Sequence, residues 1–137
     1  RMVQVTEVKY LKEDSEELEE QFEDLKIPKG VDIFEINGPF FFGAADKFKD
    51  TLNQMKTPPK VLILRMRHVP VVDATGLRAL EDLLHKARRS KMMILFCEVQ
   101  AQPYQVFESG QILERLGKEY FHDDLESCLQ HAQELLK

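Results

Sequence analysis

The sequence predicts an α/β protein built on a single, mostly parallel sheet. Residues 61–64 and 92–97 are short apolar runs, typical of interior strands that are covered on both faces. The segment between them carries an apolar stripe at helical spacing, formed by Leu77, Leu80, Leu83, Leu84 and Ala87. Strands that alternate with helices form parallel sheets through crossover connections. We therefore expect the two runs to be neighbouring strands, with Leu80 and Leu84 packed against them.

Two more strands are expected earlier in the chain. Residues 3–8 alternate apolar and polar side chains, as a strand with one solvent-facing side does. Residues 31–36 form the second strand, with its burial expected at Val31, Ile33, Phe34 and Ile36. Because no regular crossover helix follows residues 3–8, we expect the first strand to be an antiparallel edge strand.

Three more helical segments complete the pattern. Residues 44–55 place Phe48, Leu52 and Met55 on one stripe, and Pro58 and Pro59 end that helix because proline lacks a backbone N–H. A short helix is expected between Pro103 and Gly110, with another turn or two at residues 112–116. Residues 123–136 form the last helix, where Asp123 and Glu126 have the spacing of a capping box.

Length and charge indicate one domain over residues 1–137 that is not a general nucleic-acid binder. The net charge is −5, whereas nucleic-acid-binding domains are usually basic. Residues 10–29 are expected to be an acidic insertion between the first two strands. Nine acids and three bases fall within residues 7–26, and like charges repel. We expect residues 13–24 to be exposed and to form at most a short helix.

No metal site, cofactor site or enzyme motif is expected. Cys97 and Cys128 lie in apolar patterns and are interpreted as reduced core thiols. The four histidines have no metal-ligand spacing to cysteine or to each other. Glycine-rich nucleotide motifs and the nucleophile-elbow motif are absent from the sequence. Nothing in the sequence therefore argues for an enzyme.

The first candidate contact loop contains three successive phenylalanines, Phe40, Phe41 and Phe42, followed by Gly43. All three cannot point inward from a loop. Either two of them pack beneath the following helix and one is exposed by chance, or the loop is an apolar contact patch at the mouth of the sheet.

The second candidate loop precedes the helix that starts near residue 74. Its members are Asp73, Ala74, Thr75 and Gly76. Asp and Thr are natural N-cap residues, and a helix N-terminus favours an anion through its free N–H groups. The basic residues Arg65, Arg67 and Arg78 are near in sequence and are expected to help hold an anion. The alternative is that the loop only caps the helix.

Together these segments resemble a STAS domain, a family named for sulfate transporters and anti-sigma-factor antagonists. The resemblance covers residues 3–136. It rests on Gly38-Pro39-Phe40-Phe41-Phe42-Gly43-Ala44-Ala45-Asp46 and on Val69-Pro70-Val71-Val72-Asp73-Ala74-Thr75-Gly76-Leu77. Both motifs resemble in particular the C-terminal cytoplasmic domain of bacterial SulP anion transporters. The resemblance implies a mixed sheet of four to five strands, with parallel central strands and flanking helices.

The resemblance also implies that the domain acts by docking and has no catalytic activity or cofactor. As a SulP-type domain it would regulate a transporter of sulfate or a related anion. Its partner would be the transmembrane portion of the parent transporter, on the cytoplasmic side of the cell membrane. Other cytosolic proteins and self-association are further possible partners.

The alternative function is a free-standing anti-sigma-factor antagonist. In that branch the residue that Thr75 matches is the phosphorylation site. The antagonists usually carry Asp-Ser-Ser-Gly, whereas this chain has Asp73-Ala74-Thr75-Gly76. That departure and the acidic insertion favour the transporter branch.

Overall fold

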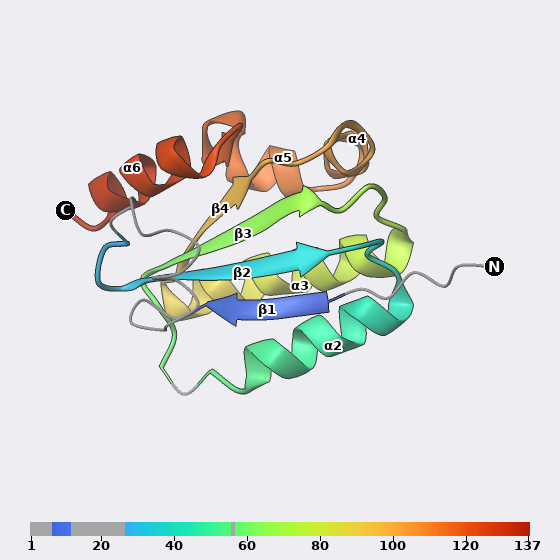
Figure 1. Ribbon diagram of the computed structural model, residues 1–137, viewed down its shortest axis with the longest axis horizontal. Helices are drawn as coiled ribbons and strands as arrows, with labels where there is room; N and C mark the ends of the chain where they lie inside the picture. The colour runs from blue at the N-terminus through green and yellow to red at the C-terminus, as the bar shows by residue number, and fades with distance from the viewer. Residues whose placement is uncertain (1–6, 12–26, 56) are drawn as a thin grey trace.

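A computed structural model describes residues 7–11, 27–55 and 57–137 of the chain. Figure 1 shows one twisted sheet with helices on both faces. The strands are β1 (Glu7–Leu11), β2 (Val31–Asn37), β3 (Val61–His68), β4 (Met93–Cys97) and β5 (Phe121–His122). The helices are α2 (Phe42–Asn53), α3 (Ala74–Ser90), α4 (Ala101–Ser109), α5 (Ile112–Leu116), the 3₁₀ turn η1 (Lys118–Tyr120) and α6 (Leu125–Leu135).

The sheet has the order β1-β2-β3-β4-β5, so strands that follow one another in sequence are neighbours. Strands β2 to β5 are parallel, and β1 pairs with β2 in the antiparallel direction. The prediction of an antiparallel first strand at the edge is confirmed, but its predicted end at residue 8 and the predicted start of the insertion at residue 10 are wrong, because pairing with β2 continues to Leu11. The two apolar runs are also neighbours, because Val61 pairs with Met93 and Leu64 with Phe96.

Side chains on the two faces of the sheet form two separate cores. One core includes Phe34, Phe48 and Leu62 and is covered by α2, α3, α4 and α5. The ring of Phe48 meets Phe34 edge-to-face at a centroid distance of 5.7 Å. Leu80 and Leu84 of α3 are buried in this core, as predicted. The other core lies beneath α6, whose Leu125, Cys128, Leu129 and Ala132 pack against β3 and β4.

The boundaries of several elements differ from those predicted. Strand β3 continues beyond the apolar run to His68, because Arg65 pairs in register with both Glu35 and Cys97. Strand β5 has only two residues, too few for an alternating pattern to show in the sequence. Helix α6 is capped by Asp124, which accepts a hydrogen bond from the Ser127 backbone N–H at 2.7 Å, and not by the predicted Asp123. The prediction for residues 13–24 lies outside the described residues.

Candidate functional site

The two candidate loops lie side by side at the carboxyl edge of the parallel strands. Phe40 and Val72 form a parallel β-bridge that continues the β2–β3 pairing beyond the strands. The Phe40 backbone N–H donates to the carbonyl of Val71 at 2.9 Å, and the Asp73 N–H donates to the Phe40 carbonyl at 3.4 Å. Ligands of open α/β sheets bind at this edge.

Gln102 of α4 holds the second loop from its other side, and this contact was not predicted. Its amide oxygen accepts a hydrogen bond from the Val72 N–H at 2.9 Å, and its amide nitrogen donates to the Val72 carbonyl at 3.2 Å. The side-chain amide thus pairs with Val72 as a neighbouring strand would. No local sequence signal marks Gln102 for this role, because Gln102 lies 30 residues after Val72 in the chain.

The three phenylalanines divide into one core residue and two surface residues. Phe40 is fully buried and contacts Phe48 edge-to-face at 5.6 Å between ring centroids. Phe41 and Phe42 are 45% and 65% exposed. Of the two interpretations that the sequence left open, the one in which two phenylalanines pack beneath the helix is therefore wrong. The reason is that α2 begins at Phe42, earlier than predicted, so that Phe41 and Phe42 stand at the helix start and point away from the core.

Asp73 is the N-cap of α3, and Thr75 stands exposed in its first turn. The Asp73 carboxylate accepts the Thr75 hydroxyl at 2.6 Å and the Gly76 N–H at 2.9 Å. Desolvation acts to raise the pKa of Asp73. The hydrogen bonds from the Thr75 hydroxyl and the Gly76 and Thr75 N–H groups act against it, and the net pKa lies below the ordinary value. The carboxylate is therefore ionised at neutral pH and takes the helix donors that an anion would use.

A hollow of about 310 Å³ between α2 and α3 brings residues of both loops together. Its lining is formed by Phe42, Ala45, Asp46, Lys49, Ala74, Thr75 and Arg78. Lys49 also reaches across the two helices to Asp82 at 3.7 Å. We call Phe41, Phe42, Thr75 and Arg78 the docking face. Phe42, Thr75 and Arg78 line the hollow, and Phe41 is the exposed residue that precedes Phe42.

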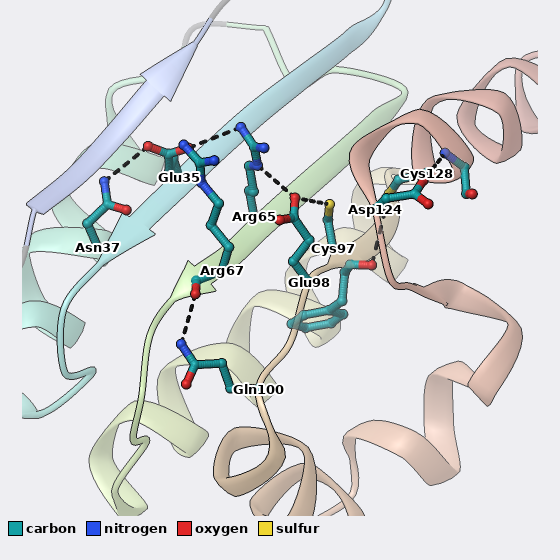
Figure 2. A network of polar contacts seen from close by, with 11 residues as sticks. Glu35, Asn37, Arg65, Arg67, Cys97, Glu98, Gln100, Asp124 and Cys128 are labelled. Atoms are coloured by element: carbon teal, nitrogen blue, oxygen red, sulfur yellow. Dashed lines mark hydrogen bonds and ion pairs between the residues drawn. The ribbon is translucent and has the colours of Figure 1, made fainter. Parts of the chain in front are cut away.

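Arg65 and Arg67 do not join this site, contrary to the prediction. Side chains alternate along β3, so Met66 faces α3 while Arg65 points to the opposite face of the sheet. Figure 2 shows Arg65 between two carboxylates, with Glu98 at 2.9 Å and Glu35 at 3.5 Å. Arg67 also reaches Glu35, at 3.9 Å. Of the three arginines, only Arg78 lines the hollow.

The sequence does carry a signal for this buried ion pair. Glu35 and Arg65 each stand four residues after the first residue of their strand, and parallel pairing aligns them. The side chains of Glu35 and Arg65 are only 5% and 10% exposed. Burying a charge is costly unless it is paired, so each of these side chains needs a partner of opposite charge.

The two cysteines have the environment predicted for core thiols. Both are buried between β4 and α6. The neighbouring Cys128 thiol and burial raise the pKa of Cys97 far above its ordinary range. The Cys97 thiol donates to Glu98 at 3.2 Å (Figure 2). A thiol held in its neutral form is a poor nucleophile, so Cys97 does not resemble a catalytic cysteine.

This arrangement, with a Pro-Phe-Phe loop bridged to an Asp-x-Thr-Gly helix start, can be compared with known proteins. The family model described as "STAS domain" matches residues 24–128. The chain belongs to the STAS domain family. Its five-stranded sheet and flanking helices are the STAS fold that the sequence motifs implied.

Relatives of this STAS domain are found among transporter proteins. A sulfate transporter family protein from Wolinella succinogenes, known from a crystal structure, is 39% identical in sequence to this chain. The two structures have a TM-score of 0.78, and the match covers 84% of this chain and 94% of that one. The SulP transporter STAS domain of Vibrio cholerae is 23% identical and shares the fold, with a TM-score of 0.71 over 89% and 98% of the two chains.

A Bacillus subtilis protein that bears the name of a sulfate transporter, YvdB, is 28% identical over 94 residues. The match covers 68% of this chain and 18% of the length of YvdB. Among the described residues, no helix has the length and apolar character required to cross a bilayer. The family model and the similarity to the Wolinella succinogenes protein show that the chain is a STAS domain of the kind found in sulfate transporter family proteins.

Proposed function

We propose that this STAS domain is the cytoplasmic regulatory domain of a SulP-type transporter of sulfate or a related anion. The domain acts by binding, with its docking face against the transmembrane portion of that transporter. It catalyses no reaction. The carrying observation is the pair of exposed rings, Phe41 and Phe42, beside a hollow lined by Thr75 and Arg78. Adjacent exposed aromatic residues are typical of protein interfaces.

The construction of the face supports docking by a rigid surface. Phe40, between the exposed rings and the sheet, is fully buried, and its backbone is bridged to Val72. Gln102 fixes Val72 in turn. A surface that is already held in place loses little conformational freedom when a partner binds, and this favours affinity.

The test is transport by the full parent protein with Phe41→Ser and Phe42→Ser together. We expect transport to fall strongly while the melting temperature of the isolated domain stays close to that of the wild type, because both rings are already exposed. The matched control is Met93→Ser, which removes another exposed apolar side chain far from the docking face. Unchanged transport with the paired serine substitutions would refute the proposal.

Thr75 separates this function from the antagonist alternative, because both use the same helix start. A phosphate on Thr75 would add about −1.5 to −2 charge beside the ionised Asp73 carboxylate. In the transporter function, Thr75→Ser should preserve transport and Thr75→Glu should impair it while the domain still folds. If Thr75→Glu and Thr75→Ala change neither transport nor partner binding, Thr75 has only a structural role. Phosphorylation of the purified chain by an anti-sigma kinase, with Thr75→Ala as the blocked control, would instead favour the antagonist.

A further inference from the structure

A cluster of cations occupies the far end of α3 from the docking face. Lys86, Arg88, Arg89 and Lys91 are all exposed there, and we call these four residues the basic cluster. Within the residues that the structure describes, none of the four forms an ion pair. The cluster stands out because the whole chain has a net charge of −5.

Capping of the helix explains only part of this charge. Cations near a helix C-terminus are favourable, but the effect is limited to the last turn and is already served by Arg88 and Arg89. Lys86 lies one residue before that turn. Lys91 follows the helix in a left-handed conformation (φ 58°), and its N–H already bonds to the carbonyls of Ala87 and Arg88. Four neighbouring cations that have no acidic partner among the described residues repel one another, so folding of the described part of the chain does not account for them.

The basic cluster lies in the same helix layer as the docking face. Helices α2 and α3 pack side by side on one face of the sheet (Figure 1). Helix α3 has 17 residues, so its two ends are about 25 Å apart. Thr75 and Arg78 stand at one end of the helix and Arg88 and Arg89 at the other. One orientation, with α3 lying flat, therefore presents both surfaces in the same direction.

We propose that the basic cluster binds anionic lipid headgroups of the membrane while the docking face contacts the transporter. That a membrane lies near the domain rests on the proposed function. That the basic cluster favours a negatively charged partner does not rest on it. Long, exposed lysine and arginine side chains that have no ion-pair partner among the described residues suit a fluid array of negative charges better than a partner of fixed shape. Each basic residue close to an anionic leaflet strengthens binding about fivefold, so several together give measurable affinity.

The experiment is vesicle co-sedimentation of the purified 137-residue chain. Vesicles of phosphatidylcholine alone are compared with vesicles that also contain phosphatidylglycerol. We expect binding only to the second kind, and we expect that binding to weaken as salt rises, because salt screens exposed charges. The variant Lys86→Gln, Arg88→Gln and Arg89→Gln should bind about a hundredfold more weakly. Glutamine keeps helix propensity, so the fold is expected to survive.

The matched control replaces Lys47, Lys118 and Lys137 by Gln, which changes the net charge by the same amount at exposed positions outside both the basic cluster and the docking face. It should bind far more tightly than the cluster variant. Equal loss in the two variants would show that only net charge matters and would overturn the proposal. Absence of binding by the wild-type chain at low salt would also overturn it.

A third result concerns the acidic insertion. If vesicles bind the chain only after residues 13–24 are deleted, the partner of the cluster is this chain's own acidic segment, and the lipid proposal is wrong. None of these outcomes depends on transport. Failure of lipid binding is therefore distinguishable from failure of the docking face, which is read from transport by the Phe41 and Phe42 variant.

Discussion

The carbonyl oxygen of Phe40 occupies the space that a β-carbon at position 76 would need. A β-carbon on Gly76 would collide with that oxygen and lie 2.7 Å from the Phe40 ring carbon Cδ2. The first turn of α3 therefore approaches the phenylalanine loop as closely as only glycine allows. This contact explains why the two sequence motifs belong together: the glycine of one is required by the backbone of the other.

Substituting Gly76→Ala should destabilise the domain by about 1–3 kcal/mol, because the added methyl group meets backbone that is fixed by hydrogen bonds. Urea unfolding followed by circular dichroism measures the loss. Gly43→Ala is the matched control, since a β-carbon there has nothing within 4 Å and the residue lies in α2. It should leave stability unchanged or raise it by up to about 1 kcal/mol. Similar losses in both variants would contradict the close-contact argument.

Substituting Gln102→Ala should cost about 1–3 kcal/mol, because the buried Val72 loses partners for both its N–H and its carbonyl. It should also loosen the helix start at Thr75, which amide hydrogen exchange would detect as faster exchange at residues 72–76. The control is Gln100→Ala. Gln100 is exposed and bonds one carbonyl, that of Arg67, at 2.8 Å, so its loss should cost less than about 1 kcal/mol. Unchanged exchange in Gln102→Ala would show that α4 does not hold the loop.

Substituting Glu35→Gln should destabilise the domain by about 1–3 kcal/mol, because it removes one of the two carboxylates that pair with the buried Arg65, while Glu98 remains at 2.9 Å. The comparison is Lys49→Ala, which breaks the exposed pair with Asp82. That change should cost less than about 1 kcal/mol, because solvent screens the pair. Chemical denaturation of both variants at neutral pH measures the difference. Equal small losses would mean that water reaches Arg65 freely.

The pair His122 and His131 should make stability depend on pH near neutrality. His122 Nε2 lies 2.8 Å from His131 Nδ1, so one imidazole donates to the other. Burial and the neighbouring His131 lower the pKa of His122 below its ordinary value of 6.5, against the opposing pull of Asp124 and Asp123. The unfolded chain thus binds a proton more readily than the folded chain. Stability should be fully present above pH 6.5 and should fall as pH drops from there through the folded-state pKa.

Unfolding measured across that pH range tests the prediction. His122→Asn should flatten the pH dependence, whereas His68→Asn, at an exposed position outside the pair, should preserve it. A profile that stays equally steep in His122→Asn would locate the titrating group elsewhere.

Much of the architecture follows from the sequence because it depends on local patterns. The apolar runs predicted two neighbouring interior strands, and the stripe through Leu80 and Leu84 predicted the helix that covers them. Both are confirmed. The two motifs predicted the STAS family, which is also confirmed. These signals are readable because strand burial, helical periodicity and turn chemistry are each encoded within about ten consecutive residues.

What only the tertiary structure decided concerns direction and distance between segments. The sequence placed Arg65, Arg67 and Arg78 together, but alternation along β3 sends Arg65 to the opposite face of the sheet and into pairing with Glu35 and Glu98. It likewise left open which phenylalanines are exposed, since that depends on where α2 begins relative to β2. The two hydrogen bonds between the Gln102 side chain and the Val72 backbone join residues that are 30 apart in the chain. Such contacts are fixed by the packing of whole elements, because the side chains that meet have no pattern in common along the sequence.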